Sequence, residues 1–297
     1  MLCPKRYSQS SYLTAGVVRN QSNRVEQMNS GKDISVVIPV YEAAYFIKLT
    51  LQTIADQSLL PLEVVIVDDG SRDDTCKVVE DFCQKNPHLD VRLIREKHRG
   101  PGFARNVGIK AAKGRWVAFL DSDDLWHKNK IEKIISASKL APEANFFCHN
   151  EIHRLADKQE TILDYSVGYR NDLPLASQLF KRNLFSTSAV VCQKDRAIEV
   201  GGFDEALSSA QDYEFWFRMT PGLKVNFVRE VLGVYVERPG NISSGKIWRR
   251  YSNLLKVLFR HRKLVTRKIF IGSVLRNSAA YIYYWIMSGK YIGGLWR

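Results

Sequence analysis

Residues 116–124 have the sequence WVAFLDSDD, in which an apolar run ends directly at a cluster of three aspartates. The run predicts a buried strand. Carboxylates this close together repel one another, and a divalent metal bound to phosphate oxygens would hold them together, because Mg²⁺ and similar cations prefer carboxylate and phosphate oxygens. The alternative is a solvated turn in which Asp123 or Asp124 caps a helix that begins near Trp126.

Three apolar runs upstream of this cluster are also short and rich in β-branched residues. They span residues 34–38, 62–67 and 91–95. Such runs predict strands that are buried on both faces of a parallel sheet. Apolar residues at helical spacing lie between them, within residues 44–57 and 73–83. Strands that alternate with helices predict a parallel sheet joined by crossover connections.

Three of the four predicted strands lead into residues suited to binding a ligand. The first leads into Pro39 and Tyr41, the second into Asp68 and Asp69, and the last into residues 121–124. Parallel strands end at one edge of the sheet, and open α/β sheets bind their ligands outside the carboxyl ends of the strands. The sequence therefore predicts a ligand site at this edge.

The ordered motifs of this chain resemble those of the inverting glycosyltransferases of family 2. The motifs are VVIPVY at 36–41, VDDGS at 67–71, GFARNVGI at 102–109, FLDSDD at 119–124, GGFDE at 201–205 and QDYEFWFR at 211–218. The resemblance covers about residues 33–245. It implies an α/β fold: a single GT-A-type domain with a mostly parallel central sheet flanked by helices, which binds a nucleotide sugar and receives the acceptor in its C-terminal half.

The resemblance implies that the donor is held at these strand ends. Asp69 would accept a hydrogen bond from the N–H of a uracil-type base, Tyr41 would flank or stack on that base, and Arg105 would neutralise the diphosphate or hold an aspartate of the cluster. The alternatives are a turn cap for Asp69, a partly buried loop position for Tyr41 and a position on the surface of a helix at 102–113 for Arg105. The donor-binding set is Pro39, Tyr41, Glu42, Asp69, Gly100, Arg105, Asp121, Ser122 and Arg238.

The same resemblance implies a metal site in the aspartate cluster. Asp121 and Asp123 would hold Mn²⁺ or Mg²⁺ against the donor diphosphate, where the metal acts as a Lewis acid. Few protein ligands are expected, because Mg²⁺ keeps several waters and substrate oxygens. Asp124 is expected to cap a helix or to support the two ligands.

Asp212 is the residue that the resemblance places as the general base. An inverting transfer needs a carboxylate on the face opposite the leaving group, to take the proton of the attacking hydroxyl. The alternative is a helix-terminal acid, because residues 212–219 are expected to be helical. Gln211 stands where the family usually has Glu, and Arg238 stands near where it often has His, in a loop that is expected to close over the donor. Phe215 and Trp216 are expected in the core.

The net charge of +13 comes entirely from the C-terminal part of the chain. Residues 238–297 contain 13 Lys and Arg and no Asp or Glu, and the other 31 basic residues are balanced by 31 acidic ones. Residues 246–297 are expected to form a helical, basic amphipathic segment that binds an anionic membrane surface. The alternatives are helices that pack on the domain or against a second copy in a homodimer. Nucleic acid is not expected as a partner, because the aspartate-rich site would repel phosphate without metal.

The cysteines, the N-terminal residues and the histidines give less information about function. The five cysteines are an odd number without a Cys-x-x-Cys pair, and Cys76 and Cys83 are expected to be small core residues, which indicates a reducing cytosol. Residues 1–32 are expected to be a disordered or non-native extension, with Met28 as a candidate start of translation. His149 and His153 are four positions apart, as on one helix face, and are expected to be structural.

These observations predict an inverting transferase on the inner, cytoplasmic face of a membrane. It would move a hexosyl or N-acetylhexosaminyl group from a nucleotide-diphosphate sugar to a glycan or lipid-linked glycan, as in the synthesis of a cell-envelope polysaccharide. UDP is the expected nucleotide, with dTDP and GDP open. The alternative is a non-catalytic nucleotide-sugar-binding subunit of a glycan-synthesis complex. A nucleotidyltransferase would not explain Asp212.

Overall fold

A computed structural model of the chain describes residues 28, 30–238 and 247–293. The expectations for residues 1–27 and for the loop after Arg238 lie outside these residues. The expectation of a disordered extension through residue 32 is wrong for its last residues, because Met28 is buried in the core and Gly31–Asp33 form a short 3-10 helix that leads into the first strand. The strands are β1 (Ile34–Val40), β2 (Glu63–Asp68), β3 (Val91–Arg95), β4 (Trp116–Phe119), β5 (Leu125–Trp126), β6 (Phe146–Arg154), β7 (Glu160–Leu163), β8 (Val190–Gln193) and β9 (Val225–Val236). The helices are α1 (Ile47–Ala55), α2 (Thr75–Lys85), α3 (Pro101–Ala111), α4 (Lys130–Leu140), α5 (Leu175–Leu179), α6 (Lys194–Glu199), α7 (Gln211–Met219), α8 (Ile247–His261) and α9 (Arg267–Gly293).

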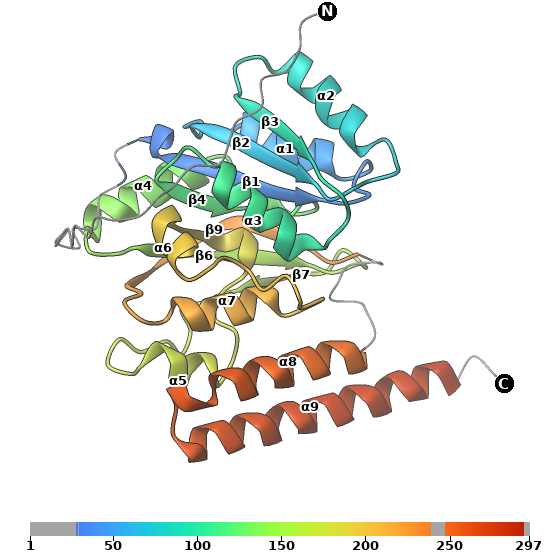
Figure 1. The fold of residues 1–297 in the computed structure, drawn as a ribbon, viewed down its shortest axis with the longest axis vertical. Helices are drawn as coiled ribbons and strands as arrows, with labels where there is room; N and C mark the ends of the chain where they lie inside the picture. The colour runs from blue at the N-terminus through green and yellow to red at the C-terminus, as the bar shows by residue number, and fades with distance from the viewer. Residues whose placement is uncertain (1–27, 29, 239–246, 294–297) are drawn as a thin grey trace, which may run out of the picture.

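The strands form one sheet in the order β3-β2-β1-β4-β8-β6-β9-β5, with β7 paired to β6. Helices cover both faces of this sheet (Figure 1). The prediction of a mostly parallel sheet is wrong for the second half. Strands β1 to β4 pair in parallel, as do β6 and β9, whereas the β4–β8, β6–β8, β6–β7 and β5–β9 pairs are antiparallel. The sheet is therefore mixed, because regular strand–helix alternation stops after β4.

The predicted strands and helices of the first half are present, but the prediction that residues 91–95 are buried on both faces is wrong, because β3 is an edge strand and is at most half-buried. The predicted helix at 44–57 is α1, which turns Ile47, Leu51 and Ile54 into the core. The predicted helix at 73–83 is α2, and the carboxylate of Asp73 accepts a hydrogen bond from the Thr75 N–H at 3.1 Å. Local apolar spacing is enough to specify both helices, and Asp73, two positions before α2, adds a hydrogen bond at the start of that helix.

Helix α3 lies unusually close to the sheet. A Cβ on Gly108 would come within 2.4 Å of Val37 Cγ1 on β1, so only glycine permits this approach. The helix carries Arg105 on its buried side. Close packing of α3 on β1 therefore fixes the position of the Arg105 side chain beneath the sheet edge at which β1 ends.

The aromatic residues that were expected in the core are buried there. Phe215 and Trp216 of α7 are fully buried, as predicted. Phe215 packs against Phe203 with ring centroids 4.4 Å apart, and Phe119 at the end of β4 meets Phe203 at 5.4 Å. This packing fixes the start of α7 beside the aspartate cluster that follows β4.

Three local expectations are wrong. Trp126 lies in β5, and the next helix begins only at Lys130. His149 and His153 lie on β6 rather than on a helix. Cys76 and Cys83 are only half-buried, whereas Cys148 and Cys192 are the buried cysteines. The segments of Trp126 and of the two histidines are shaped by strand pairing with distant residues, which local spacing does not reveal, whereas Cys76 and Cys83 lie on α2.

Helix α8 is joined to α7 by a buried carboxylate. Glu214 is 1% exposed and lies 2.6 Å from Arg218, 3.2 Å from Arg260 and 3.3 Å from His261. Burial alone would raise the pKa of Glu214, but hydrogen bonds from His261, Arg218 and Arg260 lower it to about 2. The C-terminal helices are thereby held to the rest of the domain by a charge network as well as by apolar contact.

Replacing Glu214 by Gln is expected to reduce the free energy of unfolding by about 3 kcal/mol at pH 7, because Arg218 and Arg260 lose a buried, charged partner. The folded-state pKa lies below the ordinary value of 4.5, so this contribution is complete above about pH 4.5 and is lost as the pH falls toward about 2. Urea unfolding as a function of pH measures it. The control is Glu199→Gln, which removes an exposed pair with Arg196 and should change stability by less than about 1 kcal/mol. Equal effects of the two substitutions would contradict the role given to Glu214.

Candidate active site

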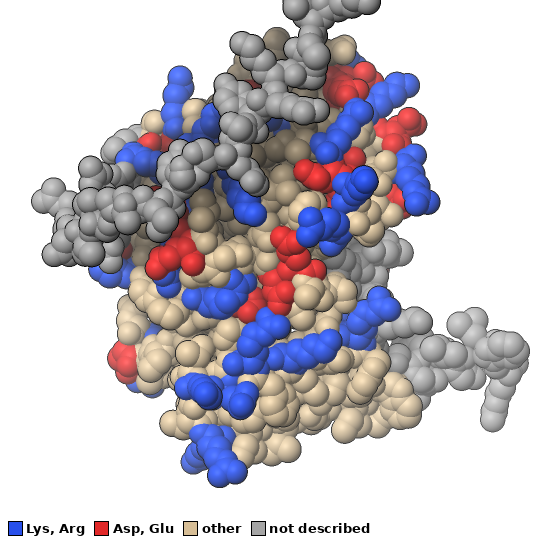
Figure 2. Space-filling view, viewed as in Figure 1, with Lys and Arg blue, Asp and Glu red and all other residues tan. Residues whose placement is uncertain are grey.

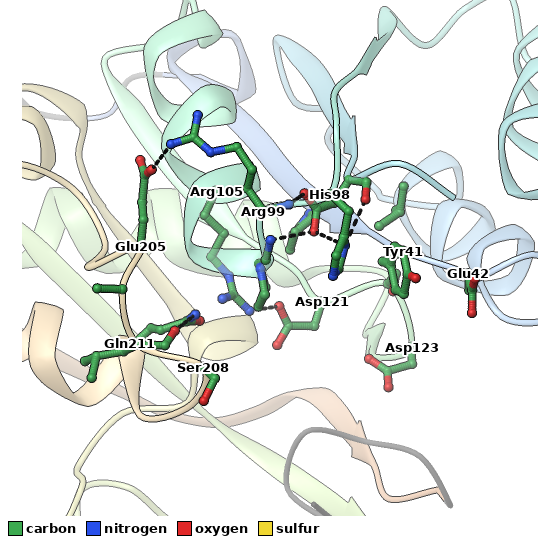
Figure 3. Close-up of a pocket in the computed structure, with 18 of the residues that line it drawn as sticks. Tyr41, Glu42, His98, Arg99, Arg105, Asp121, Asp123, Glu205, Ser208 and Gln211 are labelled. Carbon is green, nitrogen blue, oxygen red and sulfur yellow. Dashed lines mark hydrogen bonds and ion pairs between the residues drawn. The ribbon is translucent and has the colours of Figure 1, made fainter. Parts of the chain in front are cut away.

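A cavity of about 860 Å³ opens where β1, β2 and β4 end. Figure 3 shows Asp121 and Asp123 projecting into one space that also borders Tyr41, His98 and Arg105. Every residue of the predicted donor-binding and metal sets lines this cavity. These are Pro39, Tyr41, Glu42, Asp69, Gly100, Arg105, Asp121, Ser122, Asp123 and Arg238. The strand ends therefore converge as the sequence predicts.

Asp69 is deeply placed and already accepts hydrogen bonds from the protein. Its side chain is 2% exposed, and its two oxygens accept the N–H groups of Arg99 and Gly100, each at 2.8 Å. His98 Nδ1 lies 2.9 Å from the same carboxylate. Gly100 has φ +98, a left-handed conformation that favours glycine. Asp69 thus holds the loop between β3 and α3 against the end of β2. The expected turn-cap alternative applies to its neighbour instead, because the carboxylate of Asp68 accepts the Ser71 N–H at 3.2 Å.

Tyr41 forms an aromatic wall together with a residue that the sequence analysis missed. Its ring is 43% exposed and lies 4.2 Å, centroid to centroid, from the ring of His98. The signal for His98 was present, because the run at 91–95 is also a parallel strand and the residues after it reach the same edge. Glu42 beside Tyr41 has φ +47, and its N–H donates to Ser71 Oγ at 2.9 Å, which joins the ends of β1 and β2.

Each of the first two aspartates of the cluster is paired with an arginine. Arg105 Nη2 lies 2.5 Å from Asp121 Oδ1, so Arg105 is held at the site rather than on a helix surface. Arg238 Nε lies 2.8 Å from Asp123 Oδ2, and its guanidinium stacks 3.7 Å above the ring of Phe46. Burial and the neighbouring charge of Asp121 raise the pKa of Asp123, whereas Arg238 opposes the rise. The two carboxylates are therefore within electrostatic reach of one another, as a shared cation would require.

Asp124 does not cap a helix. It is buried and accepts hydrogen bonds from Ser188 Oγ at 2.5 Å and from the Val236 N–H at 3.0 Å. Ser188 Oγ also accepts the Asp121 N–H at 3.0 Å. Asp124 thus ties the aspartate loop to the end of β9, which carries Arg238. Burial and the charge of Asp123 raise its pKa well above the ordinary value.

A buried lysine supports the cluster from below and was also missed. Lys130 Nζ donates to the Ser188 carbonyl at 3.0 Å and lies 3.4 Å above the Trp126 ring. Burial lowers the pKa of Lys130 well below its ordinary value. Lysine at the start of a helix is common on protein surfaces, so nothing in the local sequence indicated this buried position.

A second cavity, of about 360 Å³, adjoins the first and contains Asp212. The two cavities share four lining residues: Arg105, Asp121, Gln211 and Tyr235. Asp212 Oδ2 accepts a hydrogen bond from Asn183 Nδ2 at 3.1 Å. Burial raises the pKa of Asp212, opposed by the charge of Arg105. Asp212 is therefore not a lining residue of the first cavity, but it borders the space that opens from it.

The region that contains most of these motifs matches a known protein family. The family described as Glycosyl transferase family 2 matches residues 35–193, which is more than half of the 297 residues. The chain belongs to glycosyltransferase family 2. Its matched region runs from β1 to β8 and contains the aspartate cluster.

Relatives of this family 2 glycosyltransferase come from several bacteria. An uncharacterised glycosyltransferase of Rickettsia conorii is 32% identical over 200 residues, which are 64% of this chain and 30% of that protein. The chondroitin synthase of Escherichia coli is 27% identical over 193 residues, which are 63% of this chain and 26% of that protein. A putative teichuronic acid biosynthesis glycosyltransferase, TuaG of Bacillus subtilis, is 40% identical over 100 residues, which are 34% of this chain and 39% of that protein. The chain thus spans less than two fifths of the length of each of these three relatives.

Solved structures share the GT-A-like fold. S. aureus TarS 1–349 in complex with UDP-GlcNAc superposes with a TM-score of 0.63 and 21% identity, covering 76% of this chain and 66% of that one. The mannosyltransferase PcManGT of Pyrobaculum calidifontis, in complex with GDP-Man and Mn²⁺, gives a TM-score of 0.61 and 21% identity, covering 89% of this chain and 73% of that one. Both neighbours hold a nucleotide sugar.

The residues of this family 2 domain fit a divalent metal that has few protein ligands. Across the described residues, no three His, Cys, Asp or Glu side chains are grouped as a metal site. Asp121 and Asp123 nevertheless offer hard oxygen donors on the cavity wall, next to each other and each held by one arginine. Mg²⁺ and Mn²⁺ suit such a pair when donor phosphates and waters complete the coordination.

Proposed function

We propose that this chain transfers a sugar, with inversion, from a nucleotide-diphosphate sugar to a hydroxyl group of a glycan or lipid-linked glycan. The observation that carries the proposal is the pair of adjoining cavities. The first is lined by the aspartates and arginines suited to a diphosphate, and the second contains Asp212. A donor in the first cavity and an acceptor in the second would meet where Arg105 and Asp121 line both.

Asp212 has the properties that a general base needs. Its carboxylate accepts from Asn183, which orients it, and burial raises its pKa, so it takes up a proton more readily than an exposed aspartate. In a single displacement the acceptor oxygen would bond to C1 of the sugar as the bond from C1 to the phosphate oxygen breaks. Asp212 would take the hydroxyl proton, and the nucleoside diphosphate would leave with the bonding electron pair.

Asp121 and Asp123 would hold Mn²⁺ or Mg²⁺, which supplies Lewis-acid stabilisation of the leaving diphosphate when it is bound. The chain's own cations act beside it. Arg105 and Arg238 reach the two aspartates and border the first cavity, so they can orient the donor's phosphates and offset their charge. Asp124 and Ser188 keep the aspartate loop in place.

The nucleotide is proposed to be UDP, because the cavity wall formed by Tyr41 and His98 offers a ring surface for a base. The TarS neighbours bound to UDP and UDP-GlcNAc support this choice, and the neighbour bound to GDP-Man keeps GDP as a second candidate. Relatives named for chondroitin and teichuronic acid synthesis support a polysaccharide of hexosyl or N-acetylhexosaminyl units as the product. A non-catalytic binding subunit would have no need of the carboxylate of Asp212 in the second cavity.

A donor screen tests the transferase proposal. The full chain is incubated with UDP-, dTDP- and GDP-sugars, and release of nucleoside diphosphate is measured with Mn²⁺ or Mg²⁺ and again with EDTA. The expected result is slow release from one nucleotide class without acceptor, which falls to background with EDTA and rises with a glycan acceptor. Metal-dependent binding of a nucleotide sugar without release under any condition would favour the binding subunit, and neither binding nor release would overturn the proposal.

A further inference from the structure

Helices α8 and α9 form an antiparallel pair along one edge of the molecule (Figure 1). Tyr251 of α8 stacks on Tyr281 of α9 with centroids 4.4 Å apart, and its hydroxyl lies 2.6 Å from Ser278 Oγ. On the inner side of α9, Ser273 Oγ donates to the Phe180 carbonyl at 2.6 Å. One side of α9 is therefore fixed to the domain.

The outer side of α9 is apolar and faces solvent. Ile271, Leu275, Ile282 and Ile286 are each between 45% and 64% exposed. They are separated by four, seven and four positions, which places them on one helix face. Tyr283, Tyr284 and Trp285 are also exposed, but consecutive helix positions point in different directions, so these rings surround the helix near Ile282 and Ile286. We call the four aliphatic residues the α9 outer face. A contiguous apolar surface of this kind marks an interaction site.

The charged residues near the α9 outer face are basic. The sequence contains no Asp or Glu after Glu237, whereas Arg267 and Lys268 stand at the first turn of α9 and are exposed. In the view of Figure 2, the surface over α8 and α9 is basic and apolar, and the acidic groups lie above it. A two-fold dimer through this face would offer Arg267 and Lys268 no acidic partner, because the second copy presents the same residues. An anionic lipid surface instead matches both the charge and the apolar residues.

We propose that the α9 outer face lies in the surface of an anionic lipid bilayer. None of the helices within the described residues is long and apolar enough to cross a membrane. In this proposal α9 lies parallel to the surface, because its exposed aliphatic residues run along one side of the helix and can enter the acyl chains. Tyr and Trp side chains favour this water–lipid boundary, because one part of each ring system is apolar and another forms hydrogen bonds. The proposal does not depend on the transferase activity, so its failure would leave the proposed function standing.

The helical pair is also connected to the two cavities. Asn253 of α8 donates to Ser208 Oγ and Ser209 Oγ, each at 3.0 Å. Ser208 lines the first cavity and Ser209 lines the second. Binding of α9 to a bilayer would therefore hold both cavities near the lipid surface, where a lipid-linked acceptor is found.

Vesicle co-sedimentation of the full chain tests the proposal. Vesicles of phosphatidylcholine with an equal amount of phosphatidylglycerol are compared with vesicles of phosphatidylcholine alone. Binding to the anionic vesicles is expected to be at least about tenfold tighter and to weaken as salt is raised, because the lipid charge is screened. Equal binding to both vesicles, or binding to neither, would overturn the proposal.

A double variant, Leu275→Asn with Ile282→Asn, is expected to weaken binding to the anionic vesicles at least about tenfold, because two apolar side chains no longer enter the bilayer. Both positions are exposed, so the fold is expected to persist, and circular dichroism checks this. Leu140→Asn is the matched control, because Leu140 is an exposed aliphatic residue on α4. The proposal would be contradicted if the double variant bound the anionic vesicles as tightly as the control. It would also be contradicted if the unmodified chain formed a dimer without lipid and the double substitution, but not the control substitution, dissociated that dimer.

Discussion

Asp212→Asn is expected to slow sugar transfer by about 10²–10⁴-fold while donor affinity changes by less than about twofold. Asparagine keeps the size of the side chain and can still pair with Asn183, but it cannot take the proton of the acceptor hydroxyl. Asp212 does not line the first cavity, so the proposed donor contacts remain. Transfer is measured by nucleoside diphosphate release with acceptor present, and donor affinity by calorimetric titration.

The matched control for this variant is Asp195→Asn. Asp195 is also an acidic residue in the first turn of a helix, α6, and it is exposed and lines neither cavity. Its replacement should leave both rate and affinity unchanged. If Asp212→Asn retained the transfer rate of the control, the proton would be taken by another group and the assignment of the base would fall.

Asp123→Asn is expected to reduce the affinity for UDP in the presence of Mn²⁺ by about 100-fold. EDTA is expected to lower the UDP affinity of this variant much less than it lowers that of the unmodified chain. One proposed metal ligand is lost, and Arg238 loses the carboxylate that lies 2.8 Å from it. Calorimetric titration of UDP with Mn²⁺ and with EDTA gives both quantities.

Asp172→Asn serves as its control. Asp172 is also paired with an arginine, Arg170, at 2.6 Å, but both side chains are 63% exposed and neither lines either cavity. UDP binding by this variant should match that of the unmodified chain. Tight, EDTA-sensitive binding by Asp123→Asn would show that the metal is held without Asp123.

The parallel half of the sheet could be predicted from the sequence, because each of its elements is specified locally. The runs that became β1 and β2 are mostly apolar, the run that became β3 is rich in aliphatic residues but contains two arginines, and the helices between them show regular spacing. Since parallel strands end together, the meeting of Asp69, Asp121 and Asp123 at one edge also followed. His98 was overlooked only because the residues after the third run were not considered as another strand end.

The second half could not be predicted in the same way, because its elements depend on distant partners. Strand β6 contains His149, Asn150 and Glu151, all buried, which no apolar pattern reveals. Asp124 accepts hydrogen bonds from residues 64 and 112 positions away, so its neighbours in sequence suggested a helix cap instead. The order of the antiparallel strands is likewise fixed by tertiary pairing.

The strand order has a consequence for how the chain is made. Strands β1 to β4 and their helices occupy the first 119 residues, so they can assemble while later residues are still being synthesised. Among the strands that the structure describes, β5 pairs only with β9, and β6 lies between β8 and β9. Until residues 225–236 leave the ribosome, β5 and one edge of β6 have no partner, and exposed strand edges promote aggregation. Between the completion of β6 and the arrival of β9, the growing chain is therefore expected to expose strand edges that the finished sheet covers.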